Sequence, residues 1–102
     1  MAQVFKNYTQ ASIGTSPATV YTVPSGTTSI VIGLNLANRT ANTITASAQL
    51  GSVYIIKDAP IPGGGALSVL EGKIIAEAAD TIVVTSNTAS STDAIVSVLE
   101  QT

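Results

Sequence analysis

The side chains that could do chemistry in this sequence are six carboxylates and a large number of hydroxyls. The chain has 14 Thr and 11 Ser but neither His nor Cys. Without His, a nucleophilic hydroxyl loses its usual general base, and without Cys there is no thiolate and no disulfide. A Lys could replace the His, but Ser68 and Lys73 do not have the spacing of a Ser-x-x-Lys motif. We therefore expect the hydroxyls to lie on the surface.

The carboxylates do not form a catalytic or metal-binding motif. A glycosidase needs two of them facing each other across a cleft, and a calcium loop needs alternating Asp residues. Glu71, Asp80 and Asp93 instead fall at expected turns, where acids are normally solvated. The six acids are Asp58, Glu71, Glu77, Asp80, Asp93 and Glu100. We predict that none of them transfers a proton, that the chain is not an enzyme, and that it has no catalytic, cofactor-binding or metal-binding residues.

The glycine-rich segment at residues 63–65 is the only candidate for a phosphate-binding loop. Such a loop ends in Gly-Lys-Ser/Thr at the start of a helix. Here Ala66 follows the glycines, and the later pair Gly72-Lys73 is followed by Ile74, which has no hydroxyl to offer a metal ion. The segment is therefore predicted to be a structural turn.

The charge pattern argues against nucleic acid and membranes as partners. Charged residues make up only 10% of the chain, and the net charge is −2. A nucleic-acid-binding protein concentrates positive charge on one surface, whereas the four cations, Lys6, Arg39, Lys57 and Lys73, are scattered. The longest runs of aliphatic residues have three residues, far short of the roughly 20 that span a bilayer. A surface of small hydroxyls lets neighbouring molecules approach with little electrostatic repulsion, which suits a protein packed into an assembly.

The four aromatic residues raise the alternative of a ligand-binding face. They are Phe5, Tyr8, Tyr21 and Tyr54. A receptor- or glycan-binding module would gather the three tyrosines on one exposed surface. The other interpretation is that some belong to the core and the rest to strand edges, with Phe5 and Tyr8 on opposite faces of an N-terminal strand or arm.

Alternation of apolar and polar residues with a period of two predicts strands throughout the chain. The segment between residues 67 and 79 has one helical feature, a repeat of apolar residues at i+4, but Gly72 interrupts it. We interpret it as two strands. Residues 59–65 contain two Pro and three Gly and cannot form a central strand. The expected strands cover residues 18–23, 28–38, 43–50, 53–57, 66–70, 73–78, 81–86 and 94–100, and residues 3–13 form an edge strand or an arm.

The predicted core follows from this alternation. The strand at residues 28–38 and the strand at residues 43–50 are separated by a polar turn, so we expect them to form a hairpin. Their inward-facing residues are predicted to be Ile30, Ile32, Leu34, Leu36, Ile44, Ala46, Ala48 and Leu50. Ile82 and Val84 should join them, together with either Val96 and Val98 or Ile95 and Leu99.

The predicted fold class is all-β, a single antiparallel β-sandwich of about seven to nine short strands. Immunoglobulin-like and jelly-roll topologies are both compatible with this pattern. Residues 1–13 are the N-terminal arm or edge strand, and residues 14–102 are the sandwich domain. We expect the strand at residues 94–100 to be an unguarded edge, which an N-terminal arm of a neighbouring copy could cover by strand addition.

Two longer stretches resemble a known group of proteins. One is GTSPATVYTVPSGTT at residues 14–28, which leads into IVIGLNLAN at residues 30–38. The other is KDAPIPGGG at residues 57–65, followed by GKI at residues 72–74 and ADTIVV at residues 79–84. Over most of the chain from Gly14 to Glu100, the sequence resembles small virion proteins of tailed bacteriophages. The N-terminal 13 residues lie outside this resemblance.

The resemblance implies a non-enzymatic β-sandwich component of the phage virion. The first expectation is a capsid cement or decoration protein, whose partners are itself, as a homo-oligomer, and the major capsid protein or another virion protein. The alternatives are a small tail or neck component, or a receptor- or glycan-binding module. The resemblance implies no cofactor and no catalytic residue, and it places the protein in the virion.

Overall fold

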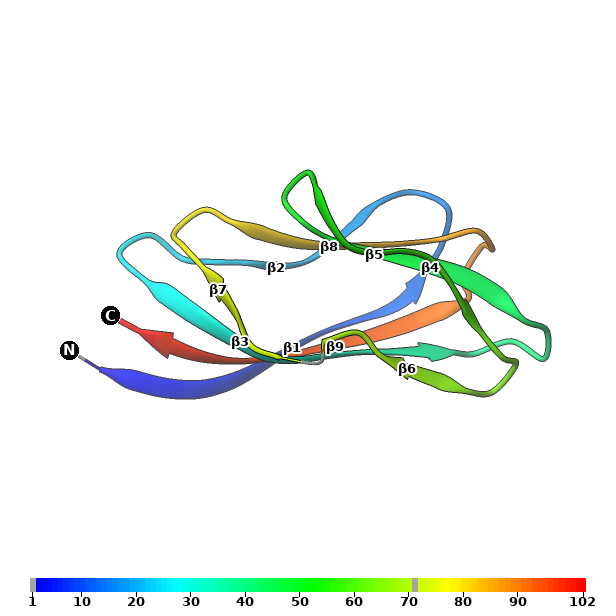
Figure 1. Ribbon diagram of the computed structural model, residues 1–102, viewed down its shortest axis with the longest axis horizontal. Helices are drawn as coiled ribbons and strands as arrows, with labels where there is room; N and C mark the ends of the chain where they lie inside the picture. The colour runs from blue at the N-terminus through cyan, green and yellow to red at the C-terminus, as the bar shows by residue number, and fades with distance from the viewer. Residues whose placement is uncertain (1, 71) are drawn as a thin grey trace.

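The computed structural model describes residues 2–70 and 72–102. In these residues the chain is all-β, with nine strands in two antiparallel sheets that form a sandwich (Figure 1). Sheet A has the strand order β1-β9-β3-β6, with β7 also paired to β3, and sheet B has the order β2-β8-β4-β5. The strands are β1 Gln3–Ile13, β2 Ala18–Thr22, β3 Thr28–Asn38, β4 Ile44–Leu50, β5 Val53–Ile61, β6 Ala66–Ser68, β7 Ile74–Ala76, β8 Thr81–Ser86 and β9 Thr92–Gln101. The predicted β-sandwich is confirmed. Among the described residues no helix is long and apolar enough to cross a membrane.

The strand pairing follows a nested pattern. β4 pairs with β5, β3 with β6 and β7, β2 with β8, and β1 with β9. The chain therefore resembles one long hairpin whose tip is the turn between β4 and β5. This hairpin is rolled up, so that successive strand pairs fall in alternate sheets. β6 and β7 pair with different halves of β3 and together occupy one edge position. This order is that of a jelly roll rather than an immunoglobulin fold.

The predicted hairpin between residues 28–38 and 43–50 is wrong, because β3 lies in sheet A and β4 in sheet B. The connection crosses from one sheet to the other, and Asn38 organises this crossing. Its buried side chain donates hydrogen bonds to the carbonyl oxygens of Asn42, Ile61 and Pro62 at 2.8, 2.9 and 3.1 Å. The true hairpin joins β4 to β5, where Leu50 pairs with Val53 and Gly51 has a φ of 60°. A polar turn between two alternating strands does not distinguish a hairpin from a crossing between sheets.

A β-bulge in β3 changes which residues face the core. Val31 pairs with Val98 and Gly33 pairs with Ser97, so Ile32 is an extra residue opposite β9. The bulge shifts the alternation by one residue. Before it, Ser29 and Val31 point inward, whereas after it Leu34 and Leu36 do. The prediction that Ile30 and Ile32 are buried is therefore wrong: Ile30 is half-buried on the outer face, and Ile32 is 41% exposed.

The rest of the core largely matches the prediction, because the bulge affects only the first half of β3. Leu50 is half-buried at the end of β4 rather than buried. Between the two alternatives for β9, the structure buries Val96 and Val98 and leaves Ile95 and Leu99 on the outer face. The largest buried apolar side chains are Leu34, Leu36, Ile44, Ile61, Ile82, Val23, Val31, Val84, Val96 and Val98.

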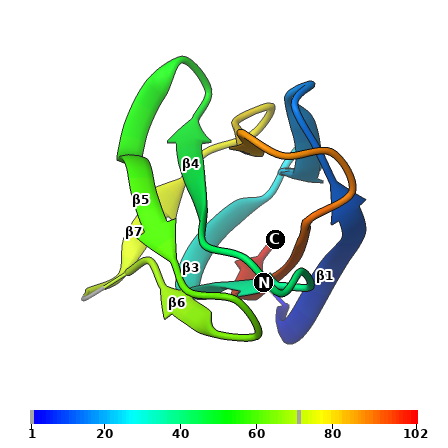
Figure 2. The same cartoon turned by 90° about the vertical axis from the view of Figure 1, so that its right-hand side faces the viewer.

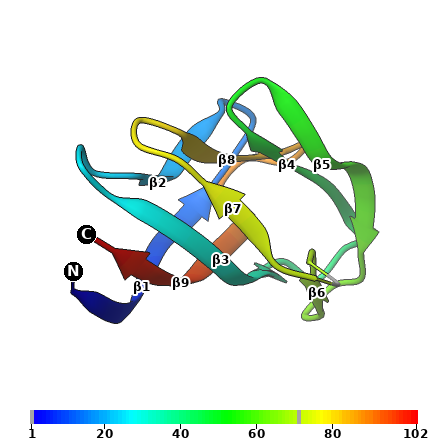
Figure 3. The same cartoon turned by 60° about the vertical axis from the view of Figure 1, so that its left-hand side comes forward.

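The sheet edges differ from the expected ones. β9 is not an edge, because it pairs with β1 on one side and β3 on the other. Gln3–Ile13 forms the edge strand β1 and pairs with β9 along its length, so it is not a free arm (Figure 3). β5 is an edge of sheet B on the opposite side of the sandwich from β1, and it accommodates Pro60, as an edge strand can (Figure 2). The segment at residues 67–79 contributes to two strands, β6 and β7, as predicted.

Candidate functional site

A buried carboxylate, Glu100, lies between the two sheets at the end of β9. Its Oε2 atom accepts hydrogen bonds from the hydroxyls of Tyr8 and Tyr21, at 2.8 and 2.7 Å. The Lys6 ammonium lies 3.5 Å from Oε1. The Tyr21 hydroxyl also lies 2.5 Å from Ser29 Oγ, and the rings of Tyr8 and Tyr21 are stacked with centroids 4.3 Å apart. The Glu100 cluster, made of these five residues, ties β1 and β2 to β3 and β9.

The electrostatics of the Glu100 cluster keep the carboxylate charged and the tyrosines neutral. The hydrogen bond from Tyr21, helped by Tyr8 and the Lys6 ammonium, outweighs burial and lowers the pKa of Glu100. Burial raises the pKa of Tyr21 to about 12, and burial also raises the pKa of Tyr8, with the nearby Glu100 charge adding to both shifts. Glu100 is only 6% exposed, and its acceptor sites are occupied by residues of the chain itself. The cluster therefore joins the two sheets through hydrogen bonds to a buried carboxylate.

The Glu100 cluster predicts a specific loss of stability in acid. Because the pKa of Glu100 is lower in the folded than in the unfolded chain, the ionised carboxylate stabilises the fold above the unfolded pKa, near 4.5. This contribution should be lost as the pH falls through that value and below. Glu100→Gln should lower the free energy of unfolding by about 1–3 kcal/mol at pH 7, and the difference from wild type should shrink in acid. Urea unfolding between pH 7 and pH 3 measures both effects.

Glu77→Gln is the matched control for this experiment, since Glu77 is exposed. It should follow the wild-type pH profile. If Glu100→Gln also followed that profile at every pH, the hydrogen bonds of the Glu100 cluster would not stabilise the fold.

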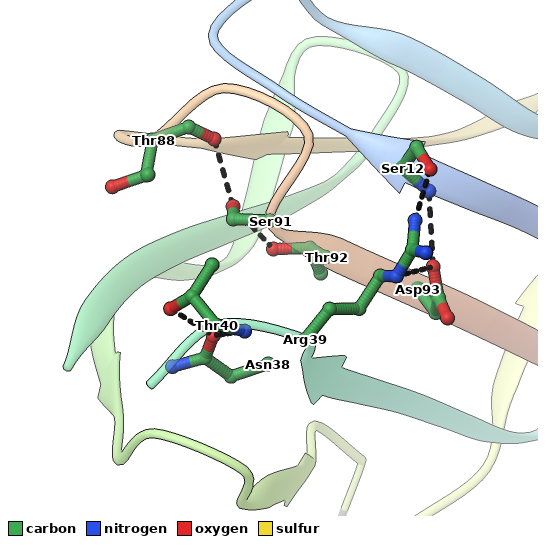
Figure 4. Close-up of polar contacts among 8 residues, drawn as sticks. All are labelled: Ser12, Asn38, Arg39, Thr40, Thr88, Ser91, Thr92 and Asp93. Atoms are coloured by element: carbon green, nitrogen blue, oxygen red, sulfur yellow. Dashed lines mark hydrogen bonds and ion pairs between the residues drawn. The ribbon is translucent and has the colours of Figure 1, made fainter. Parts of the chain in front are cut away.

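A second polar cluster lies at the other end of the sandwich and joins β1, β9 and the connection after β3 (Figure 4). The Arg39 guanidinium donates a hydrogen bond to Ser12 Oγ, and its Nε lies 3.6 Å from Asp93 Oδ1. The same Asp93 oxygen accepts a hydrogen bond from the backbone N–H of Ser12 at 2.9 Å. A guanidinium cannot accept the proton of a serine hydroxyl. The trio therefore resembles a catalytic triad only in having a Ser and an Asp, because the residue that contacts the Ser12 hydroxyl is a permanently protonated guanidinium.

The neighbouring hydroxyls organise loops. Ser91 Oγ donates to the carbonyl of Thr88 at 2.7 Å (Figure 4). It also lies 2.6 Å from Ser86 Oγ. Thr40 hydrogen-bonds to Asn38 Oδ1 through both its backbone N–H and its hydroxyl. No buried polar side-chain atom in the described part of the chain lacks a hydrogen-bond partner. The hydroxyls of these loops therefore serve as hydrogen-bond partners within the chain.

The carboxylates considered as candidates for catalysis or metal binding lie apart from one another in the structure. Asp58 and Glu77 are exposed, and Asp80 accepts a hydrogen bond from the backbone N–H of Glu77 in a turn. Asp93 pairs with Arg39, and Glu71 lies outside the described residues. Within residues 2–70 and 72–102, no three His, Cys, Asp or Glu side chains come together in a way that could hold a metal ion.

The tyrosines do not share one exposed face. Tyr8 and Tyr21 stack in the Glu100 cluster, and Tyr21 is fully buried. Tyr54 is 50% exposed on β5, at the opposite edge of sheet B from the β2 strand of Tyr21, with the Lys57 ammonium 5.3 Å from its ring centroid. The three tyrosines therefore do not form the single exposed surface that would favour glycan binding.

The main candidate for a binding surface is the outer face of sheet A, which sequence analysis missed. The register places a row of apolar residues across four adjacent strands: Phe5 of β1 opposite Leu99 of β9, Leu99 opposite Ile30 of β3, and Ile30 opposite Ile75 of β7. Phe5 is 74% exposed and Ile75 is 55% exposed. Exposed apolar residues gathered on one face of a small protein usually mark an interaction site.

Two further residues enlarge this apolar face, and a shallow hollow lies within it. Ile32, the extra residue of the β3 bulge, and Ile95 of β9 add their partly exposed side chains. The hollow is lined by Phe5, Lys6, Asn7, Ile32, Ser97 and Val98. A sequence signal for this surface existed: Ile95 and Leu99 alternate with the buried Val96 and Val98, so β9 is apolar on both faces.

Comparison with known proteins adds no assignment: no family model matches the chain, and no curated protein matches its sequence.

Proposed function

We propose that this chain is a non-enzymatic structural protein of a virion, and more specifically a capsid cement or decoration protein that binds the phage shell and copies of itself. The observation that carries the proposal is the apolar outer face of sheet A, which includes Phe5, Ile30, Ile32, Ile75, Ile95 and Leu99. A side chain as exposed as Phe5 is stabilised when a partner covers it.

Three further observations support this proposal. The chain resembles small virion proteins of tailed bacteriophages from Gly14 to Glu100. Its strand order is that of a jelly roll, which is common in viral capsid domains, although the fold also occurs in lectins and cupins. Two of its four cations, Lys6 and Arg39, already face acids of the chain itself, which does not favour a nucleic acid partner.

The polar clusters fit a structural role better than a catalytic one. Glu100 and Asp93 each receive hydrogen bonds from the chain itself, and each helps to join separate strands. A general acid or base needs a position within reach of a substrate proton, and the enclosed Glu100 does not have one. The three tyrosines do not form the shared exposed surface that would favour a glycan-binding module.

The test of the proposed function is mass spectrometry of purified virions from the phage that encodes this chain, after the particles are separated into capsids and tails. We expect the chain in the capsid fraction in many copies. Recovery with tails alone would contradict a decoration role and favour a tail or neck component. Absence of the chain from purified virions would contradict the proposal as a whole.

A further inference from the structure

The outer face of sheet A combines an apolar surface with an almost complete lack of charge. The outward-facing residues of β1 and β9 include Phe5, Asn7, Thr9, Ser97 and Leu99, all uncharged. At one end of this face, Asp93 is paired with Arg39. The ammonium of Lys6, at the rim of the hollow, lies near Glu100. Two copies of a chain with a net charge of −2 repel each other least through such a face.

The face also carries a projection and a hollow side by side. Phe5 has the largest exposed fraction among the large apolar side chains of the described residues. The hollow beside it is lined by Asn7, Ile32 and Ser97. Gly33 lies directly opposite Ser97 in the register, and a Cβ built on Gly33 would meet no atom within 4 Å. The strand position beside Ser97, where a side chain would project from the outer face, is therefore occupied by a glycine.

This arrangement is self-complementary. We infer that the outer face of sheet A is a two-fold interface between two copies of this chain. Phe5 of each copy enters the hollow beside Gly33 and Ser97 of the other copy. A two-fold contact uses the same patch on both molecules, so one patch must supply both the projection and the recess. The adjacent Phe5 and hollow meet this requirement. The inference deepens the proposed function and rests on it for its biological setting, because it names the face through which the protein binds itself.

The size of the face matches such an interface. The molecule measures 45 × 21 × 20 Å, and in Figure 1 the two sheets are stacked along the vertical direction. The outer face of sheet A is therefore bounded by a rectangle of about 900 Å², so a contact that covers most of the face reaches the roughly 800 Å² per partner of a standard stable interface. Stacked sheets in proteins pack about 10 Å apart through such apolar faces.

The experiment is sedimentation equilibrium of the full chain and three variants over the micromolar range. The wild type should have twice the chain mass of 10.3 kDa. Phe5→Ala removes the projection, and Gly33→Val adds a side chain opposite Ser97 of the hollow, at a position where a Cβ meets no atom within 4 Å. Each should weaken dimerisation roughly thirtyfold or more, as expected for a central anchor of an interface. The control is Val53→Ala, because Val53 is 68% exposed but lies on sheet B; it should dimerise as the wild type does.

Thermal unfolding of each variant at low concentration tests whether the monomer still folds. If Phe5→Ala perturbs the edge strand, Gly33→Val provides an independent test of the interface. A monomeric wild type, an oligomer other than a dimer, or a dimer unaffected by both Phe5→Ala and Gly33→Val would overturn the inference. These outcomes are separate from those of the virion analysis. A monomer found in virions refutes the interface and self-binding but not binding to the shell, whereas a Phe5-dependent dimer absent from virions refutes only the role in the virion.

Discussion

Leu34→Ala should lower the free energy of unfolding by about 2–5 kcal/mol. Leu34 is 1% exposed and points into the core of the sandwich from the second half of β3, where it pairs with Val96. The truncation removes apolar contacts on one side and leaves a cavity that two packed sheets cannot easily close. Chemical denaturation with urea, monitored by far-UV circular dichroism, measures the loss.

Ile32→Ala is the matched control for this prediction. Ile32 and Leu34 both lie on β3, but Ile32 is the extra residue of the bulge, whereas Leu34 follows the bulge and faces the core. Ile32 is 41% exposed, so its truncation should change the free energy of unfolding by less than about 1 kcal/mol at protein concentrations where the chain is monomeric. Equal losses in the two variants would contradict the bulge and would favour an uninterrupted alternation along β3.

Gly63→Ala should destabilise the fold by about 1–3 kcal/mol or more through a steric clash. A Cβ at this position would lie 2.3 Å from the carbonyl oxygen and 2.4 Å from the carbonyl carbon of Ala41, and 2.9 Å from the backbone nitrogen of Asn42. These are backbone atoms of the crossing between β3 and β4, which cannot move aside as a flexible side chain could. Thermal and urea unfolding of the variant measure the effect.

Gly72→Ala separates this clash from the general effect of replacing a glycine. No atom lies within 4 Å of a Cβ built on Gly72. Its substitution should therefore be neutral or slightly stabilising, because Ala restricts the unfolded chain more than Gly does. A Gly63→Ala variant as stable as Gly72→Ala would show that the loop at residues 63–65 does not pack against the crossing.

The prediction from sequence was most successful where a strand alternates without interruption. The bounds of β3 and β8, and the inward-facing residues of β4 and β8, follow directly from apolar periodicity, because one face of each strand packs on the opposite sheet. The periodicity failed at Ile32, where one extra residue inverts the pattern. The adjacent Gly33 is the residue that could have signalled the bulge, since an isolated glycine within a strand often marks one. The periodicity also failed for the partners of β3 and β4, since pairing depends on contacts far apart in the sequence.

The candidate site was less predictable than the fold, because it depends on which strands are neighbours. Glu100 follows Val96 and Val98 on the inward face of β9, so a buried carboxylate could have been suspected. Its partners Tyr8 and Tyr21 come from two other strands, and their stack depends on how β1 and β2 face each other. In the same way, the apolar row from Phe5 to Ile75 exists only because β9, β3 and β7 come together in register.

The central position of β9 has a consequence for the order of folding. Sheet A needs residues 92–101 to join β1 to β3, and even the backbone groups of Ala2 and Thr102 are hydrogen-bonded to each other, beside the two termini in Figure 3. The hairpin of β4 and β5 can form from local contacts, but β1 has no partner until residues near the other end of the sequence have left the ribosome. Loop closure over such a distance slows folding. We therefore expect β1, with its exposed Phe5, to be the segment that chaperones contact longest during synthesis.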